Sequence, residues 1–180
     1  MRVDTDFEPL VTERLLLRRS RPEDAEAISG YRRDPDVHRF QGWERTDPEG
    51  VRRAIEEMAD RAPGEPGGWV QFSVVDRSSK QLIGDVGISR SEGEPDVMKI
   101  GYTMAPGFQG RGYATEAVRA LIDYVFDMLG AHTVHAYASA ENVASHRVAE
   151  KAGMHLAERF QRRHGGERWS GVRYEIRQGS

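Results

Sequence analysis

The stretch from residue 100 to residue 117 constrains the fold of this chain more than any other part of the sequence. An alternating apolar strand ends at Met104, three glycines follow at positions 107, 110 and 112, and an amphipathic helix begins directly after them. The first turn of a helix has backbone N–H groups without intrahelical partners, and the helix dipole adds partial positive charge there. Glycines let the backbone approach an anion because they lack a Cβ atom. The stretch therefore predicts an anion-binding loop, with Arg111 as a nearby cation.

Two common phosphate-binding motifs do not fit this loop. A P-loop requires G-x-x-x-x-G-K-[ST], and the sequence contains no such run. A dinucleotide fingerprint requires G-x-G-x-x-G/A, but counting from Gly110 and Gly112 places Thr115 at the third position. The spacing that does occur is Gln109-x-x-Gly112-x-Ala114. It resembles the Q/R-x-x-G-x-G/A element of the GNAT N-acetyltransferase superfamily, whose loop holds the pyrophosphate of acetyl-CoA.

A second segment, from Glu141 to Met154, strengthens this resemblance. It reads ENVASHRVAEKAGM and is similar to the N-x-x-S/A…E-K-x-G-[FM] segment of the superfamily, at the expected distance and after the expected strand. The longer string GFQGRGYATEA resembles the Rim-type branch, which includes acetyltransferases of ribosomal-protein N-termini. The resemblance covers roughly residues 14 to 174, which is nearly the whole chain.

The composition fits one globular domain over residues 1–180. No apolar run reaches the roughly 18 residues of a membrane helix, and the N-terminus does not have the pattern of a signal peptide. The chain has no cysteine, so we expect neither disulfides nor a covalent acyl-cysteine intermediate, and a cytoplasmic location. A net charge of −3 argues against direct binding of nucleic acid through overall charge.

Apolar periodicity and capping residues predict the element order β-α-α-β-β-β-α-β-α-β-β. Asp47 and Asn142 are the expected N-caps of the second and fourth helices, and Gly130 and Gly153 follow the third and fourth. This is the order of the GNAT fold, so we expect a mixed α/β fold whose mostly antiparallel central sheet splays at the cofactor site and is flanked by helices. The predicted strands are 15–17, 69–76, 81–89, 97–104, 133–138, 154–162 and 168–176, and the predicted helices are 22–34, 47–59, 115–129 and 142–153.

The resemblance implies where acyl-CoA lies. It should lie between the strands 97–104 and 133–138, with its pantetheine arm along the main chain near residues 103 and 104. Backbone N–H groups from 109 to 114 should hold the pyrophosphate, and the last helix should face the cofactor with its N-cap. The predicted cofactor-binding residues are Thr103, Met104, Gln109, Gly110, Arg111, Gly112, Tyr113, Ala114, Thr115 and Asn142.

The catalytic residues of the family match this sequence less well. Rim-type sequences commonly carry a glutamate base before the I-G-Y triplet, where this chain has Lys99, and the frequent tyrosine acid is replaced by Ala149. Ser145 remains the candidate for protonating the leaving thiolate, although it could instead serve only as a local backbone partner. Carboxylates that could replace the base are Asp85, Asp96 and Glu141, and a water chain to solvent would also serve.

The acceptor site is expected near the loop from residue 38 to 43, where Phe40 and Trp43 either line the site or attach the loop to the core. Asp85 and Lys99 are further candidates, and Lys99 would favour an acidic acceptor or an acidic acyl group such as succinyl. Holding an amine neutral at pH 7 costs about 1.4 kcal/mol for an α-amine and about 4.6 kcal/mol for a lysine. An acceptor with an α-amine therefore needs less help from a base.

These observations predict an acetyl-CoA-dependent N-acetyltransferase that acts on a primary amine by direct attack on the thioester, with a peptide N-terminus favoured. Two alternatives stay open: an enzyme for small amines such as aminoglycosides or polyamines, and an acyl-CoA-binding sensor module without turnover. We expect no metal site, because His132 and His135 have a spacing that places them on opposite faces of a strand. The resemblance makes a homodimer plausible, and we expect no membrane partner.

Overall fold

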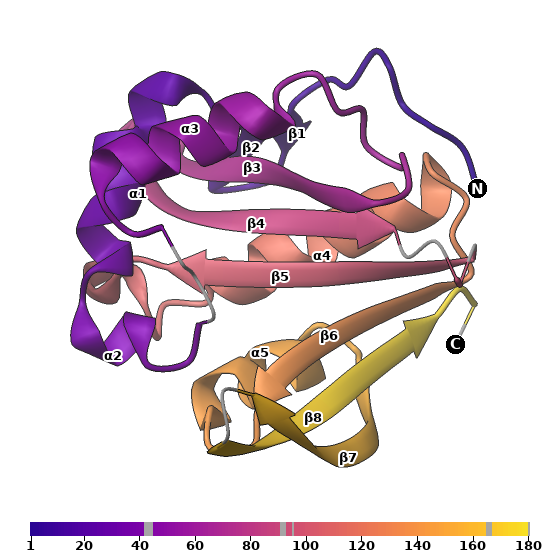
Figure 1. The fold of residues 1–180 in the computed structure, drawn as a ribbon. Coiled ribbons are helices and arrows are strands. Elements are labelled where there is room, and N and C mark those ends of the chain that lie inside the picture. Colours follow the sequence, from indigo (N-terminus) through magenta and orange to yellow (C-terminus); the bar gives the residue numbers. More distant parts are fainter. Residues whose placement is uncertain (42–44, 91–92, 95, 165–166, 180) are drawn as a thin grey trace.

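The computed structural model describes residues 1–41, 45–90, 93–94, 96–164 and 167–179. In this described part, the strands form one eight-stranded sheet in the order β1-β2-β3-β4-β5-β6-β8-β7, with helices on both faces (Figure 1). The mixed α/β fold predicted from the sequence is therefore confirmed. The elements are β1 (Leu10–Val11), β2 (Leu15–Arg19), the 3₁₀ turn η1 (Pro22–Asp24), α1 (Ala25–Arg32), α2 (Pro35–His38), α3 (Pro48–Met58), β3 (Gly68–Asp76), β4 (Leu82–Arg90), β5 (Val97–Met104), the 3₁₀ turn η2 (Pro106–Phe108), α4 (Tyr113–Asp127), β6 (Thr133–Ser139), α5 (Val143–Lys151), β7 (His155–His164) and β8 (Glu167–Arg177).

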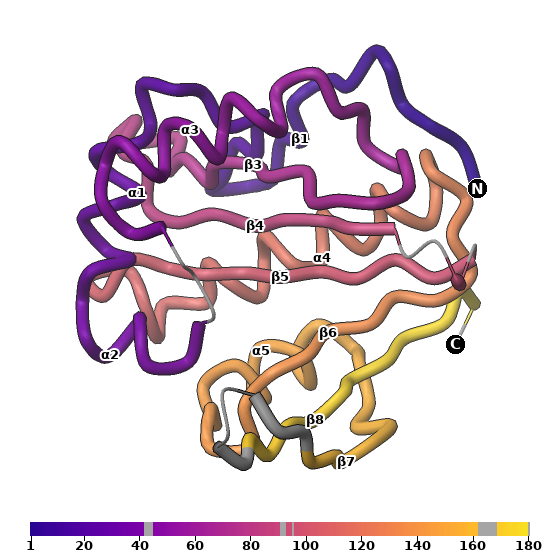
Figure 2. Tube along the Cα trace, in the orientation of Figure 1, coloured from indigo at the N-terminus to yellow at the C-terminus, as the bar shows by residue number. Residues whose placement is uncertain are grey.

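The sheet opens between its two central strands, β5 and β6. These two strands run parallel, whereas the other neighbours in the sheet are antiparallel. Their register has four pairs, from Val97↔Thr133 to Ile100↔Ala136, and in the described residues no pair follows. Figure 2 shows the two traces lying together near both chain termini and separating toward α2 and α5. The splay predicted between these strands is therefore present.

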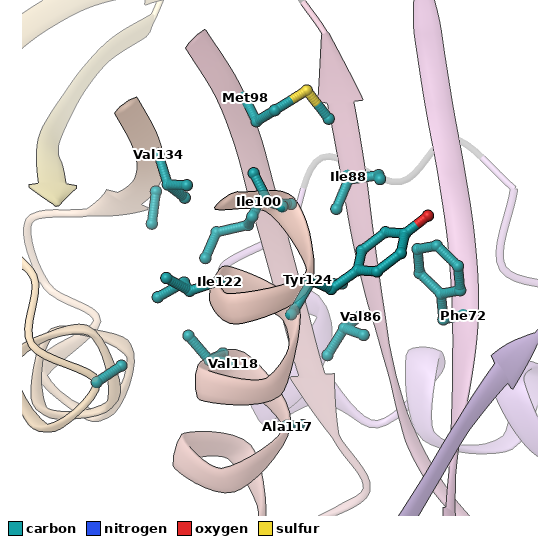
Figure 3. Close-up of a cluster of buried hydrophobic side chains, with 14 of the residues drawn as sticks. Phe72, Val86, Ile88, Met98, Ile100, Ala117, Val118, Ile122, Tyr124 and Val134 are labelled. Atoms are coloured by element: carbon teal, nitrogen blue, oxygen red, sulfur yellow. The ribbon is translucent and has the colours of Figure 1, made fainter. Parts of the chain in front are cut away.

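Helix α4 packs along the face of the sheet that holds most of the core. In Figure 3, Val118 and Ile122 extend from α4 on the side where Val134 of β6 is labelled, whereas Tyr124 extends toward Phe72 of β3. The predicted apolar stripe of this helix is buried, with exposed fractions between 0 and 3%. Removing one such side chain typically costs about 2–5 kcal/mol, so this packing fixes α4 and the loop before it relative to β5. The stripe consists of Val118, Leu121, Ile122 and Val125 of α4 and of Leu129, which was predicted to end the helix but follows its observed end at Asp127.

Helices α1 and α3 cover the opposite face and share a smaller core. That core joins Ile28 and Tyr31 of α1 to Val51 and Ile55 of α3. Asp47 caps α3 as predicted, because its side chain accepts a hydrogen bond from the Gly50 N–H at 2.9 Å.

The structure also corrects parts of the sequence reading. Residue 38 was predicted to lie in a loop but is the last residue of the short helix α2. This helix starts with an Asp–Pro pair, as α3 does, and the Asp34 side chain caps it by accepting from the Asp36 N–H at 2.9 Å. Helix α4 begins at Tyr113, two residues earlier than predicted, because its N-cap, Gly112, has no side chain to mark the start. Strand β1 was not predicted.

The described residues include no helix long and apolar enough to cross a membrane.

Candidate active site

A cavity of about 440 Å³ lies where β5 and β6 separate. Its walls come from the end of β5, the glycine loop, the first turn of α4, the end of β6 and α5, and residues 36–41 border it from α2 onward. Segments far apart in the sequence thus meet at one site. Every predicted cofactor-binding residue except Arg111 lines it, namely Thr103, Met104, Gln109, Gly110, Gly112, Tyr113, Ala114, Thr115 and Asn142.

The glycine loop has the geometry of an anion site. Gly110 has φ +73° and Gly112 has φ +82°, a region that residues with a Cβ atom rarely adopt. Gly112 is also the N-cap of α4, and no side chain caps this end of the helix. The N–H groups of the first turn therefore have no intrahelical partner and lie at the positive end of the helix dipole, on the wall of the cavity.

Gln109 and Met104 close the loop onto the end of β5. The Gln109 N–H donates to the Pro106 carbonyl at 3.2 Å, and its side-chain Nε2 donates to the Met104 carbonyl at 3.0 Å. Both groups were expected to contact the cofactor directly. Because these groups already have partners, the main-chain groups expected to contact the cofactor are the N–H groups from 110 to 114 and the remaining groups on the edge of β5 that faces β6. Among the described residues, this edge has no strand partner beyond Ile100.

Arg14, which the sequence reading overlooked, holds this loop from the other side. Its Nε donates to Glu116 at 2.6 Å, its Nη1 donates to the Arg111 carbonyl at 3.0 Å, and its guanidinium lies 4.5 Å from the Tyr113 ring centroid. Burial alone would raise the pKa of Glu116, but hydrogen bonds from Thr12 and Arg14 outweigh it and hold the pKa below its usual value. The clamp joins residues about a hundred positions apart, so no local pattern could reveal it.

The cations around the loop differ from those expected. Arg111 is exposed, its guanidinium lies 5.8 Å from the Phe108 ring centroid, and its side chain does not line the cavity. Arg147 and Lys151 of α5, which were not predicted, do line it. A second hollow of about 830 Å³ lies between residues 10–14 and α4, and its lining includes Arg14, Arg119 and Lys151 together with four carboxylates. The carboxylates belong to Glu13, Glu116, Asp123 and Asp127.

Ser145 and Tyr102 form a hydroxyl pair on the cavity wall. The Ser145 hydroxyl donates to the Tyr102 oxygen at 2.9 Å, and the Tyr102 hydroxyl donates to the Ser145 carbonyl at 2.8 Å. Asn142 caps α5 as expected, accepting from the Ser145 N–H at 3.0 Å. Burial raises the pKa of Tyr102 to about 12, so this hydroxyl is protonated at neutral pH. The alternating pattern of β5 had assigned Tyr102 to the strand's apolar face, and only the contact with α5 reveals its polar role.

Asp85 is buried between α1 and β4. It is 7% exposed, accepts a hydrogen bond from the Tyr31 hydroxyl, and lies 3.6 Å from Nη2 of Arg32. Burial raises the pKa of Asp85 above its usual value, although Arg32 and Tyr31 act in the opposite direction. The side chain anchors α1 to β4 and is not part of the cavity lining, which corrects its assignment to the acceptor site.

Of the remaining candidates for the acceptor site, Phe40 lines the cavity and Lys99 does not. Phe40 lines it, beneath the Arg39 guanidinium at 4.3 Å from the ring centroid, and Gln41 beside it donates to the Thr103 hydroxyl at 3.3 Å. Lys99 is half-buried on β5 outside the lining, in register with His135 of β6. Trp43 lies outside the described residues. Asp96 and Glu141, the other carboxylates considered, are exposed and do not line the cavity.

No group of three or more histidine, cysteine, aspartate or glutamate side chains that could hold a metal ion occurs in the parts of the chain that the structure describes.

Comparison with known proteins agrees with this geometry. Residues 14–155 match the family model of the acetyltransferase (GNAT) domain. The chain therefore belongs to the GNAT acetyltransferase family. It is 30% identical over 169 residues to YnaD of Bacillus subtilis, described as an uncharacterized N-acetyltransferase, covering 93% of this chain and 95% of that protein.

Solved structures show the same fold. A GNAT-family acetyltransferase from Bacillus anthracis superposes with a TM-score of 0.84 at 28% identity, covering 96% of this chain and all of the other. RimL, a ribosomal L7/L12 α-N-protein acetyltransferase in complex with coenzyme A, gives 0.81 at 17% identity, covering 94% and 98%. The spermidine N-acetyltransferase SpeG from Vibrio cholerae gives 0.74 at 19% identity, covering 93% and 95%. These neighbours include enzymes for protein and for small-amine acceptors, so the fold alone does not select the acceptor.

Proposed function

We propose that this enzyme transfers the acetyl group of acetyl-CoA to the α-amine of a peptide or protein N-terminus, as expected for the Rim-type branch. One observation carries the proposal: the cavity at the β5/β6 splay has the glycine loop on one wall and Phe40, a residue expected to contact the acceptor, on another. The loop suits the pyrophosphate, and the free edge of β5 suits the amide groups of the pantetheine arm.

The Tyr102–Ser145 hydroxyl pair is suited to protonate the leaving thiolate. As the C–S bond of the thioester breaks, the thiolate needs a proton, and the Tyr102–Ser145 pair lies on the cavity wall with one protonated phenol. Tyr102 can donate its proton to sulfur and take one from Ser145. This assignment extends the expected role of Ser145 to a pair of residues.

The charges of the cavity favour a peptide over a polyamine. A polyamine carries several positive charges and would be stabilised by carboxylates, but Asp36 is the one carboxylate on the lining formed by described residues. Arg147 and Lys151 add positive charge to the same lining. An α-amine also costs about 3 kcal/mol less to deprotonate at pH 7 than a lysine side chain. Both arguments favour an N-terminal α-amine as the acceptor, and small amines are the second candidate class.

Calorimetry with acetyl-CoA tests the donor site. Gly112→Glu places a side chain in the positive-φ N-cap and a carboxylate where an anion should bind, so we expect at least a 30-fold loss of affinity. Gly107→Ala is the matched control in the same loop, because a Cβ atom there meets nothing within 4 Å. Unchanged affinity in Gly112→Glu would contradict the assignment of the loop, provided that thermal melting shows both variants folded.

Thiol release with a panel of acceptors tests the reaction. We expect turnover with peptides that have a free N-terminus and little with spermidine, with an aminoglycoside or with an N-acetylated peptide containing lysine. Turnover of spermidine alone would instead support the small-amine alternative. Tight binding of acetyl-CoA without release for any amine would identify a non-catalytic acyl-CoA-binding module.

A further inference from the structure

His135 of β6 lies beside the position where the family's glutamate base is replaced by lysine. It is in register with Lys99, one pair before Ile100↔Ala136, where the pairing of β5 with β6 ends. Side chains in register share a face of the sheet, and Lys99 alternates with Tyr102, whose side chain reaches α5 on the other face. His135 therefore lies at the apex of the splay, on the face opposite α5, which it shares with Tyr137 of the cavity lining.

A buried carboxylate supports the imidazole. Nε2 of His135 lies 3.0 Å from Oε2 of Glu175, and the other oxygen of Glu175 accepts from Arg177 at 2.9 Å. Nη1 of Arg173 donates to the same Oε2 at 2.8 Å and lies 2.8 Å from Nε2. Burial would raise the pKa of Glu175, but hydrogen bonds from His135 and Arg177 outweigh it and keep the pKa below its usual value. The Glu175 carboxylate favours the Nε2–H tautomer, in which Nε2 and Nη1 of Arg173 both donate to Oε2, whereas the Arg173 N–H near Nε2 favours the opposite tautomer.

The second imidazole nitrogen, Nδ1, has no hydrogen-bond partner in the described part of the chain. His135 is 5% exposed, and its Nδ1 makes no hydrogen bond to any residue that the structure describes. Leaving a buried polar atom unpaired costs about 1–3 kcal/mol, so a purely structural histidine would normally satisfy both nitrogens. With the proton on Nε2, Nδ1 presents a free lone pair, and Tyr137, two residues further along the same face of β6, lines the cavity although His135 itself does not. This is the arrangement of a general base that a carboxylate orients.

We propose that His135 is the general base of this acetyltransferase, oriented by Glu175, and that it takes the proton of the attacking amine through one water molecule. The proposal rests on the proposed function. The ammonium of the bound acceptor passes one proton through the water to Nδ1, and the neutral amine nitrogen then forms its bond to the acyl carbon as the C–S bond breaks and releases its second proton to solvent. The thiolate takes a proton from the Tyr102–Ser145 pair, the pair takes one back from solvent, and the imidazolium releases its own to solvent, so that one proton is released overall.

The charges around His135 keep it ready to accept a proton. Burial and the Arg173 guanidinium lower the pKa of His135 below its usual value, against the raising effects of Glu175 and Glu94. Lys99 faces it from β5, and the Tyr137 ring lies 6.1 Å away on the same strand. At pH 7 the imidazole is therefore neutral. A base of low pKa suits an α-amine better than a lysine, because the difference in pKa that the proton must cross is smaller.

The pH dependence of kcat/KM for an N-terminal peptide tests the base. In the wild type, kcat/KM should fall on the acid side only below the pKa of His135, whereas in His135→Gln the fall should begin at the amine pKa of about 8. We expect a loss of about 10²-fold or more at pH 6.5 that shrinks to less than threefold at pH 9.5. His132→Gln, an exposed histidine just before β6, is the matched control and should follow the wild-type profile.

A merely structural role would lower kcat/KM by the same factor at every pH, and that result, or no loss at pH 6.5, would overturn the proposal. Long-range ¹⁵N–¹H NMR adds a readout that needs no acceptor and avoids a folding defect in the variant. It should show the Nε2–H tautomer of His135 at pH 7 in the wild type, and in Glu175→Gln a weaker preference for that tautomer. A wild-type Nδ1–H tautomer or an imidazolium at pH 7 would exclude the base. Absence of turnover in the wild type would instead overturn the proposed function itself.

Discussion

At the scale of single residues, the two faces of β5 separate the two proton transfers of the proposed reaction. Tyr102 contacts Ser145 on the side of α5, whereas Lys99 shares the opposite face with His135. The lysine that removes the expected glutamate base therefore stands beside a histidine. An acceptor amine and a leaving thiolate can exchange protons with different groups, so neither hydroxyl of the pair has to act as both acid and base.

Tyr102→Phe tests the acid side of this arrangement. The ring stays in place and the phenol is lost, so we expect single-turnover rates to fall about 10–100-fold, since general acid catalysis typically contributes 10²–10⁴ and Ser145 can replace part of it. Affinity for acetyl-CoA should change by less than about twofold. Tyr174→Phe is the control, because this buried tyrosine donates to Glu150 and does not line the cavity. Additive losses in Tyr102→Phe and Ser145→Ala would contradict a coupled pair.

At the scale of elements, two helices that border the cavity, α4 and α5, and the neighbouring helix α1 each have an identifiable residue at their start. Gly112 starts α4, Asn142 caps α5, and Asp24 ties the beginning of α1 to the sheet. Asp24 accepts from both Nη atoms of Arg18 and from the Ser73 hydroxyl, each at 2.7 Å. Burial raises the pKa of Asp24, but Arg18, the Arg21 N–H and Ser73 outweigh it and leave the pKa below its usual value.

The anchor at Asp24 should make stability depend on pH. A lowered pKa in the folded state means that its contribution is present above the ordinary aspartate pKa of about 3.9 and is lost as the pH falls further. Asp24→Asn should lower the free energy of unfolding at pH 7 by roughly 2–4 kcal/mol, and this difference should shrink toward pH 3. Urea unfolding at several pH values measures it. Asp123→Asn, an exposed residue of α4, should change little, and a pH-independent deficit in Asp24→Asn would refute the linkage.

Local sequence patterns predicted the elements better than the contacts between them. The Asp47 cap, the α4 stripe and the limits of β5 could be predicted because each depends on a few neighbouring residues. The Arg14–Glu116 contact could not be predicted, because these residues are far apart in the chain. His135 was considered only for metal spacing, since its carboxylate partner comes from β8.

At the scale of the whole molecule, the sheet consists of two parts joined along a short seam. Strands β1–β5 form one part and β6, β8 and β7 the other, and four β5/β6 pairs connect them at the end near both termini (Figure 1). Beyond the seam, acetyl-CoA would lie between the parts and contact both. We therefore expect substrate binding to stiffen the sheet as a unit.

Hydrogen exchange can measure this stiffening. Acetyl-CoA should slow exchange of amides in residues 101–104 and 137–139, because the substrate supplies partners along the open edges. Inorganic pyrophosphate, which reaches only the glycine loop, should protect residues 110–115 alone. The β3–β4 hairpin is the internal control. Equal protection of the splay by both ligands, or none by acetyl-CoA, would contradict this view of the cavity.

The glycine loop has a consequence for how the enzyme responds to its surroundings. The group that it is suited to hold is the pyrophosphate, which is identical in the acylated and the free form of the coenzyme. Most of the binding energy then does not depend on the acetyl group. Free coenzyme A should therefore bind almost as tightly as acetyl-CoA and compete with it for the site. The rate of acetylation would then depend on the ratio of acetyl-CoA to free coenzyme A rather than on the concentration of either. The activity of this enzyme would report how much of the coenzyme pool is acetylated.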